Sequence, residues 1–305
     1  MKVLLGTDGS ETAAAAVGFL AGFPFPVGTK IRIVSVIWDV LLEHEIAALS
    51  TEQWGVFQET ESGTREEVEE LLASESETLR QAGWTVTTEI RSGHPAAEIV
   101  AAAEEYEADL IVVGSHGLTG FKRFLLGSVS NQVLQSARHS VLIVRKAEEE
   151  CNGKDPEPPA PEGHPWRFLL CYDGSEPSDK AVDFCTQLDL DEEASIQALT
   201  VLPMVRLFRQ DIRQELNWVW QQKKEAEKAE LDAAADRLRQ HGANVTTALV
   251  EAGDVSHAIL DAGDEFDADL IVLGHKGKGA IERFLMGSVT PRIAHHACIS
   301  VLAVR

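Results

Sequence analysis

Two loops in this sequence carry glycines and hydroxyl side chains at a spacing suited to binding an anion. The first runs from Gly114 to Gly117, continues for nine residues and resumes at Gly127–Ser130 (Gly-Ser-Val-Ser). The second has the same spacing in Gly274–Gly277 and Gly287–Thr290 (Gly-Ser-Val-Thr). Each loop leads into a helical pattern, where unpaired backbone N–H groups and the positive end of the helix dipole attract anions, and glycine permits close approach. This pattern predicts a phosphate site.

Side chains near both loops add donors and positive charge. The hydroxyls are those of Ser128, Ser130, Ser288 and Thr290, and the nearby cations are Lys122, Arg123, Lys276, Lys278 and Arg283. His116 and His275 stand beside the glycines and could meet a phosphate, but a lone loop histidine is more often hydrogen-bonded locally, and we favour that interpretation. A structural alternative stays open for the glycines, which could serve only tight turns between a strand and a helix.

An aspartate follows the first apolar run of each half, in the triplets Asp8–Ser10 and Asp173–Ser175 (Asp-Gly-Ser). Such an aspartate can form an Asx turn or cap the next helix. At the carboxyl end of a strand it can also bond a ribose hydroxyl or a metal-bound phosphate. Both roles can hold together, and we favour the functional one because each aspartate is paired with a glycine loop.

Several other chemistries do not fit the sequence. The loops lack the order of a P-loop, and Gly277-Lys-Gly279 has no third glycine at the dinucleotide spacing. His295 and His296 have no further ligands at metal spacing, so no metal site is expected there. No candidate base supports rapid turnover, so we do not expect a fast enzyme.

Strands and helices alternate through both halves. In the first half we expect strands at 2–7, 31–37, 84–91, 109–113 and 140–145, helices at 12–20, 64–81 and 96–106 and after Gly127, and a connection over 38–63. The second half repeats the order from Arg167, with a long helix at 222–240. This alternation predicts an α/β fold of two doubly wound, mainly parallel five-stranded sheets with helices on both faces, and ligands at the carboxyl ends of the strands.

The chain length of 305 residues accommodates two domains. A run of three glutamates and several prolines breaks the pattern between the halves. We therefore expect a first domain at 1–146, a linker at 147–166 and a second domain at 167–305.

The chain is strongly acidic, with 49 acidic and 27 basic residues and a formal charge of −22. That charge argues against nucleic-acid binding, which relies on basic patches. It leaves open whether this is simply an acidic soluble protein or one adapted to high salt. No apolar run reaches membrane-spanning length and the start turns polar too early for a signal peptide, so we expect no membrane insertion and a cytoplasmic location.

With these residues in place, the chain resembles the universal stress protein family in its tandem two-domain form. The resemblance rests on the family's ATP-binding pattern G-x2-G-x9-G-[ST] in both loops, together with Asp8 and Asp173. It implies a Rossmann-like fold of the adenine nucleotide alpha hydrolase type and ATP, with magnesium on its outer phosphates, as the ligand. The adenine would contact backbone groups at Val36 and Val201, and phosphate oxygens would bind at 128–130 and 288–290.

The expected nucleotide-binding residues form two corresponding sets. The first set is Thr7, Asp8, Val36, Gly114, His116, Gly117, Gly127, Ser128, Val129 and Ser130; the second is Tyr172, Asp173, Val201, Gly274, Lys276, Gly277, Gly287, Ser288, Val289 and Thr290. The halves differ where Tyr172 replaces Thr7 and where 253–255 (Gly-Asp-Val) replaces 93–95 (Gly-His-Pro). These departures leave open a difference between the two pockets in shape or occupancy.

The resemblance also implies partners and a function. The last strands, 140–145 and 300–305, would pair within one chain, a homodimer is possible, and a protein partner is expected but not identifiable. The leading expectation is an ATP-binding regulatory protein of the stress response. The alternatives are a slow ATPase or self-phosphorylating protein, using Ser128 or Ser288, and a nucleotide-independent dimeric scaffold.

Overall fold

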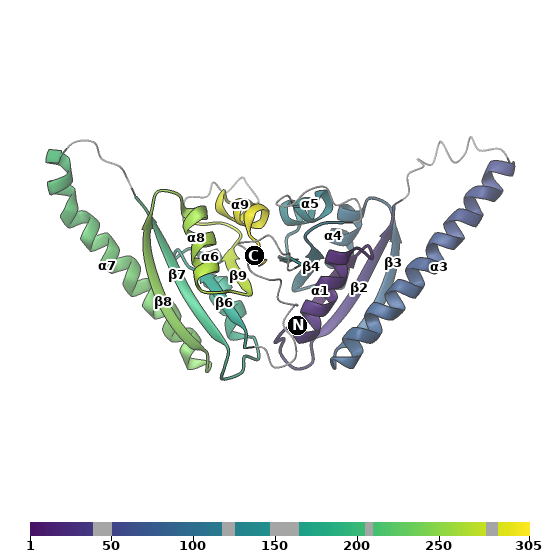
Figure 1. The fold of residues 1–305 in the computed structure, drawn as a ribbon, viewed down its shortest axis with the longest axis horizontal. Coiled ribbons are helices and arrows are strands. Elements are labelled where there is room, and N and C mark those ends of the chain that lie inside the picture. Colours follow the sequence, from purple (N-terminus) through teal and green to yellow (C-terminus); the bar gives the residue numbers. More distant parts are fainter. Residues whose placement is uncertain (39–50, 118–125, 147–164, 205–209, 279–285) are drawn as a thin grey trace. The chain divides into compact units, whose positions relative to one another are not determined.

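We analysed a computed structural model that describes residues 1–38, 51–117, 126–146, 165–204, 210–278 and 286–305 (Figure 1). The chain groups into two compact units, one built mainly from residues up to Lys146 and the other mainly from the residues after it. The expected linker falls almost wholly outside the described residues. Within the described ranges, no helix combines the length and the apolar character needed to cross a membrane.

In the described part of the first unit, parallel strands alternate with helices. The elements are β1 (Lys2–Thr7), α1 (Glu11–Gly22), β2 (Lys30–Ile37), α3 (Thr51–Gln81), β3 (Thr85–Ser92), α4 (Pro95–Tyr106), β4 (Leu110–Gly114), α5 (Ser128–Ser136) and β5 (Ser140–Val144). The strands lie in the order β3-β2-β1-β4-β5, with all neighbours parallel. The chain leaves β1 in one direction and returns on its other side, so the order reverses between β1 and β4. Ligands of such sheets bind outside the strand ends at this point.

The second unit repeats this topology. Its elements are β6 (Arg167–Cys171), α6 (Glu176–Thr186), β7 (Ser195–Pro203), α7 (Gln210–Gln240), β8 (Asn244–Ala252), α8 (Val255–Glu265), β9 (Leu270–Gly274), α9 (Val289–His296) and β10 (Ser300–Val304). The strand order β10-β9-β6-β7-β8, again parallel throughout, puts the reversal between β6 and β9. The predicted fold class, a doubly wound five-stranded α/β sheet in each half, is confirmed.

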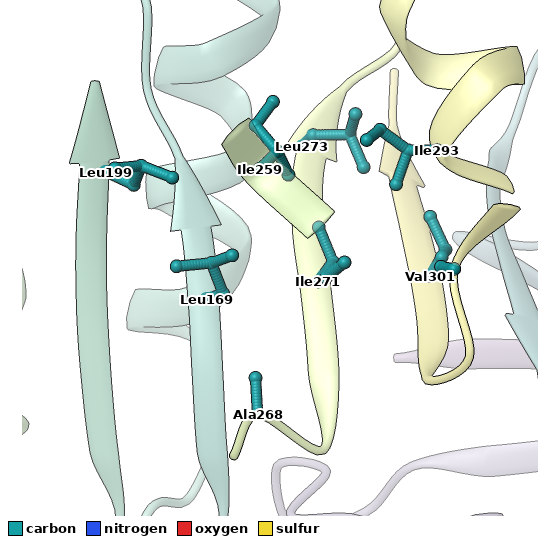
Figure 2. Packing of buried hydrophobic residues seen from close by; sticks show 9 residues of the cluster. Leu169, Leu199, Ile259, Ala268, Ile271, Leu273, Ile293 and Val301 are labelled. Atoms are coloured by element: carbon teal, nitrogen blue, oxygen red, sulfur yellow. The ribbon is translucent and has the colours of Figure 1, made fainter. Parts of the chain in front are cut away.

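Helices cover both faces of each sheet. In the first unit α1 packs with α3, and α4 packs with α5 (Figure 1). In the second unit α6 packs with α7, and α8 packs with α9. Figure 2 shows the core beneath α8 and α9, where Leu169, Leu199 and Ile271 of the sheet meet Ile259 and Ile293 of the helices. Strands covered on both sides need continuous apolar runs, which explains why the central strands lack the alternation of a half-exposed sheet.

Two long helices begin earlier than the sequence suggested. We expected a connection over 38–63 and a helix from Thr64, but α3 starts at Thr51, and α7 starts at Gln210 instead of Gln222. The segment 51–63 contains Gly55 and Gly63, and glycine is a weak helix former. Extending an existing helix avoids the unfavourable nucleation step, so a segment of low propensity can continue a helix that packing stabilises elsewhere.

Candidate functional site

The Asp-Gly-Ser turn after the first strand has the same geometry in both units. Oδ1 of Asp8 accepts a hydrogen bond from the Ser10 N–H at 3.0 Å, and Oδ1 of Asp173 accepts one from the Ser175 N–H at 3.1 Å. The central glycines have φ of 72° and 69°, a left-handed conformation that favours glycine. The serines then cap α1 and α6 through their side chains. The Asx turn foreseen as one role of these aspartates is therefore present.

The second oxygen of each aspartate faces the glycine loop. A Cβ atom on Gly117 would lie 2.7 Å from Oδ2 of Asp8, and one on Gly277 would lie 2.5 Å from Oδ2 of Asp173. In the second unit that oxygen also accepts a hydrogen bond from the Lys278 N–H at 2.9 Å. The aspartates thus lie between the turn and the loop, and a larger residue at Gly117 or Gly277 would have to displace the carboxylate.

The first glycine of each loop packs against the start of a helix. A Cβ on Gly114 would lie 2.8 Å from the Thr12 carbonyl carbon, and one on Gly274 would lie 2.6 Å from that of Pro177. The third glycines are less crowded, because the nearest atom to a Cβ would be 3.2 Å away at Gly127 and 3.4 Å away at Gly287. Packing alone is therefore enough to explain the first two glycines of each loop. This agrees with the alternative that these glycines serve only the turns between strand and helix.

Two hydroxyls expected to bind phosphate instead hold the loop. Ser130 donates to the carbonyl of Gly114 at 2.6 Å, and Thr290 donates to that of Gly274 at 3.0 Å. A hydroxyl has a single hydrogen, so in this arrangement these side chains have none to give a phosphate. The N–H groups at the start of α5 and α9 lack intrahelical acceptors, and they are the donors that point out of each helix end.

The second strand of each unit runs past its neighbour. The pairing of β6 with β7 ends at Leu199, but β7 continues to Pro203 beside β8 alone. Leu199 accepts a hydrogen bond from the Tyr172 N–H at 2.8 Å. Backbone groups of alternate residues share a side, so those of Val201 face the open space beyond β6. Val36 occupies the matching position on β2, one residue past the last pairing with β1.

A cavity of about 740 Å³ opens at this point in the second unit. All ten residues expected for the second set line it: Tyr172, Asp173, Val201, Gly274, Lys276, Gly277, Gly287, Ser288, Val289 and Thr290. Its volume falls within the range of about 300–1,000 Å³ usual for small-molecule sites. The tertiary structure therefore brings together strand ends, loop and helix start that lie far apart in the sequence.

Charged side chains missed by the sequence analysis also line this cavity. Lys223 and Glu227 reach it from α7, and Lys278, noted only as a nearby cation, reaches it from the loop. The Lys278 ammonium donates to Glu227 at 3.1 Å and to Glu230 at 3.0 Å. Burial lowers the pKa of Lys278, but its hydrogen bonds to these carboxylates outweigh that effect and leave the pKa raised. Helical spacing puts 223, 227 and 230 on one face, the only sequence signal for their proximity.

Both loop histidines make local hydrogen bonds. Nδ1 of His116 lies 3.0 Å from the Ser115 hydroxyl, and Nδ1 of His275 lies 3.1 Å from the Val304 carbonyl. The pKa of His275 is lowered, chiefly because burial disfavours the charged imidazolium. Lys276, unlike His275, lines the cavity.

The first unit has a buried acid where the second has none. The Thr7 hydroxyl donates to Oε1 of Glu75 at 2.8 Å, while Oε2 is buried with no hydrogen-bond partner among the described residues. Burial is the main cause of the raised pKa of Glu75, and the nearby charge of Asp8 adds to it. The helical pattern at 64–81 did not single out Glu75, and only the packing of α3 shows that its side chain faces inward.

The same position in the second unit is Ala234. α3 and α7 have equal length, and Gly9 faces Leu71 as Gly174 faces Glu230, which aligns Glu75 with Ala234. The exchange of Thr7 for Tyr172 therefore accompanies the loss of its acidic partner. The two sites differ in polarity at the end of the first strand.

The other departure changes a helix start. Asp254 caps α8 by accepting from the N–H groups of Ser256 at 2.9 Å and His257 at 3.2 Å. His94 makes no such side-chain bond, and Pro95 occupies the first turn of α4 instead. Proline suits that position because the first turn needs no backbone donor. The exchange thus replaces one device for starting a helix with another.

Known proteins share this duplicated architecture. A family model described as the universal stress protein family matches residues 1–145 and again 167–305. A universal stress protein of Mycolicibacterium smegmatis is 26% identical over 99% of this chain and 96% of its own length, and one of Methanocaldococcus jannaschii is 33% identical over 49% of this chain and 84% of its own. The crystal structure of a universal stress protein from Archaeoglobus fulgidus aligns with 100% of this chain and 98% of its own, with a TM-score of 0.68 at 21% identity. The chain belongs to the universal stress protein family, with one copy of its domain in each half.

Proposed function

We propose that this protein binds an adenine nucleotide, with ATP as the leading ligand, at the Asp-Gly-Ser turn and glycine loop of each half. Occupancy would act as a regulatory signal in the stress response. The observation that carries the proposal is that all ten residues of the second set line one cavity in the second unit. The first unit repeats the turn, the loop and the strand end, and for that reason we propose a second site there.

The geometry suggests how the ligand would lie. The backbone of Val201 faces open space and would hold the adenine edge, with the ribose near Asp173. The phosphates would lie near Gly277 and Gly287, where the first turn of α9 supplies N–H groups. The arrangement offers many backbone donors and no evident base, which favours binding over turnover.

Magnesium would depend on the nucleotide. Among the described residues, no group of three or more acidic, histidine or cysteine side chains could hold a metal. Each site does offer one carboxylate, Asp8 or Asp173, and Mg²⁺ is commonly held by one or two carboxylates together with substrate phosphates and water. The residues present fit a metal that arrives with the phosphates.

The test begins with the purified protein. Denaturing one sample and separating the supernatant by chromatography should reveal released adenine nucleotide. A second, native sample of the wild type, freed of bound nucleotide, should then bind ATP in a titration. The double variant Gly127→Val, Gly287→Val should lose that binding, because a Cβ at either position already contacts loop backbone, 3.2 Å from His116 and 3.4 Å from Lys276, and the bulk of valine would displace that backbone. Gly253→Ala is the control, since a Cβ there meets nothing within 4 Å.

Two results would redirect the proposal. Absence of nucleotide in the released fraction, with equal ATP binding by the wild type and the double variant, would refute it. Continuous phosphate release beyond one event per chain would instead indicate a slow ATPase. One solved universal stress protein is described in complex with cAMP, so the titrations compare ATP with AMP and cAMP.

A further inference from the structure

Lys278 stands at the junction of three elements of the second site. Its backbone N–H donates to Asp173 at 2.9 Å, and its ammonium donates to Glu227 at 3.1 Å and Glu230 at 3.0 Å on α7. The Glu227 side chain is only 17% exposed, so it lies close under the lysine and not out in solvent. One residue thus links the Asp-Gly-Ser turn, the glycine loop and the long helix.

The ion pair lies directly over the turn. A Cβ on Gly174 would overlap both the Glu230 carboxylate and the Lys278 ammonium, so glycine is what allows the pair to sit there. Lys278 lines the cavity together with Lys223 and Lys276, while Glu227 and Asp173 add negative charge to the same lining. With both carboxylates engaged, much of the Lys278 charge is neutralised before a ligand arrives.

The first half lacks this arrangement at the level of sequence. Leu118 follows Gly117 where Lys278 follows Gly277. The helix alignment that pairs Leu71 with Glu230 also pairs Val68 with Glu227. All three charged positions are therefore apolar in the first copy, and the difference is specific to the second site.

We propose that Lys278 sets the preference of the second site for nucleotides with a long phosphate chain, by exchanging Glu227 and Glu230 for phosphate oxygens. This inference rests on the proposed nucleotide binding. Two carboxylates compete for the ammonium, and a triphosphate carries more negative charge than a monophosphate with which to displace them. Charge-assisted bonds from lysine to phosphate are among the stronger contacts in proteins. The carboxylates of α7 thereby lower the affinity of the site for every anion. The reduction is largest for a nucleotide with a short phosphate chain, because it has the least negative charge with which to displace them.

The experiment uses the full chain with Gly127→Val in the first loop, so that the remaining binding belongs to the second site. ATP and AMP are titrated separately by calorimetry. Lys278→Gln should weaken ATP about tenfold, the size of one charge-assisted contact, and AMP less than about twofold. Lys278→Arg, which keeps the charge, should restore most of the ATP preference.

The carboxylate variants give the opposite sign. Glu227→Gln and Glu230→Gln should each strengthen ATP binding about threefold, because they remove a competitor for the ammonium. A purely structural role for the ion pairs would weaken binding instead. Lys228→Gln is the matched control for Lys278→Gln. It also removes one positive charge, but from an exposed position of α7 that does not line the cavity, and it should leave the affinities for ATP and AMP unchanged.

The outcomes separate the two proposals. If the wild-type chain binds no adenine nucleotide, the proposed function fails and this inference fails with it. If nucleotide binds but Lys278→Gln leaves the ATP-to-AMP ratio as it was, or the glutamine variants weaken ATP, only the role of Lys278 is overturned. If Gly127→Val disturbs folding, the Lys278, Glu227 and Glu230 variants are made in a chain with its first loop intact. The titrations should then resolve two binding sites, and the variants must change the ATP-to-AMP affinity ratio of one of them.

Discussion

Replacing Glu75 by glutamine should stabilise the first unit at neutral and alkaline pH. The side chain is 7% exposed and accepts one hydrogen bond, from Thr7, while its other oxygen has no partner among the described residues. Glutamine keeps an oxygen for Thr7 and removes the charge. A buried polar group without a partner costs about 1–3 kcal/mol, so relief of the charge should contribute on the order of 1 kcal/mol.

The effect must depend on pH with a definite sign. The pKa of Glu75 is raised above its usual value of 4.5, chiefly by burial. Below 4.5 the carboxyl is neutral in both the folded and the unfolded chain, and the variant gains nothing. As pH rises from there through the raised pKa, the unfolded chain releases its proton more readily, so the wild type loses stability and the glutamine variant does not. Above the raised pKa the difference is constant.

Scanning calorimetry across this pH range measures the difference. At about pH 8 the melting temperature of the first unit should rise by about 2–4 °C, as about 1 kcal/mol does for a domain of this size. Glu70→Gln, at an exposed position on the same helix, removes an equal charge and should show no such pH-dependent gain. A variant less stable than the wild type at alkaline pH, or a difference independent of pH, would refute the inference that burial of the charged Glu75 carboxylate destabilises the first unit.

Two further substitutions test the loops. Gly274→Ala should destabilise the second unit by about 1–3 kcal/mol, because its Cβ would meet the Pro177 backbone at 2.6 Å, whereas Gly253→Ala should be neutral in the same denaturant titration. Ser130→Ala should cost the first unit about 1–2 kcal/mol by leaving the Gly114 carbonyl without its 2.6 Å donor, and unfolding curves of the exposed-site variant Ser136→Ala serve as the reference. Equal stability of either variant and its reference would show that the packing described for that loop is not required.

Much of the fold could be predicted because its signals are local. Apolar runs of strand length, an N-cap serine at Ser10 and the proline at the start of α4 each act within a few residues. The alternation of strands and helices along the chain then predicted parallel sheets. The early starts of α3 and α7 could not be predicted in this way, because packing elsewhere in the helix stabilises a segment whose own propensity is low.

The candidate site divides along the same line. The glycine spacing and the two aspartates were visible because a turn, a loop and a helix start are continuous in sequence. Val201 was expected only from the family resemblance, and the strand order of the structure is what brings it to the same cavity as the loop and the aspartate. The hydroxyls of Ser130 and Thr290 show the limit, since the sequence predicted donors but not that they would be directed at carbonyls of their own loop.

By itself, the sequence determined that this chain has two copies of one α/β domain, each with an aspartate turn and a glycine loop at strand ends. The tertiary structure alone decided which helix side chains join them. The rotation of α3 and α7 about their axes buries Glu75 in one unit and brings Glu227 and Glu230 to Lys278 in the other. That rotation depends on how each whole helix packs against its sheet, a property that no short stretch of residues encodes.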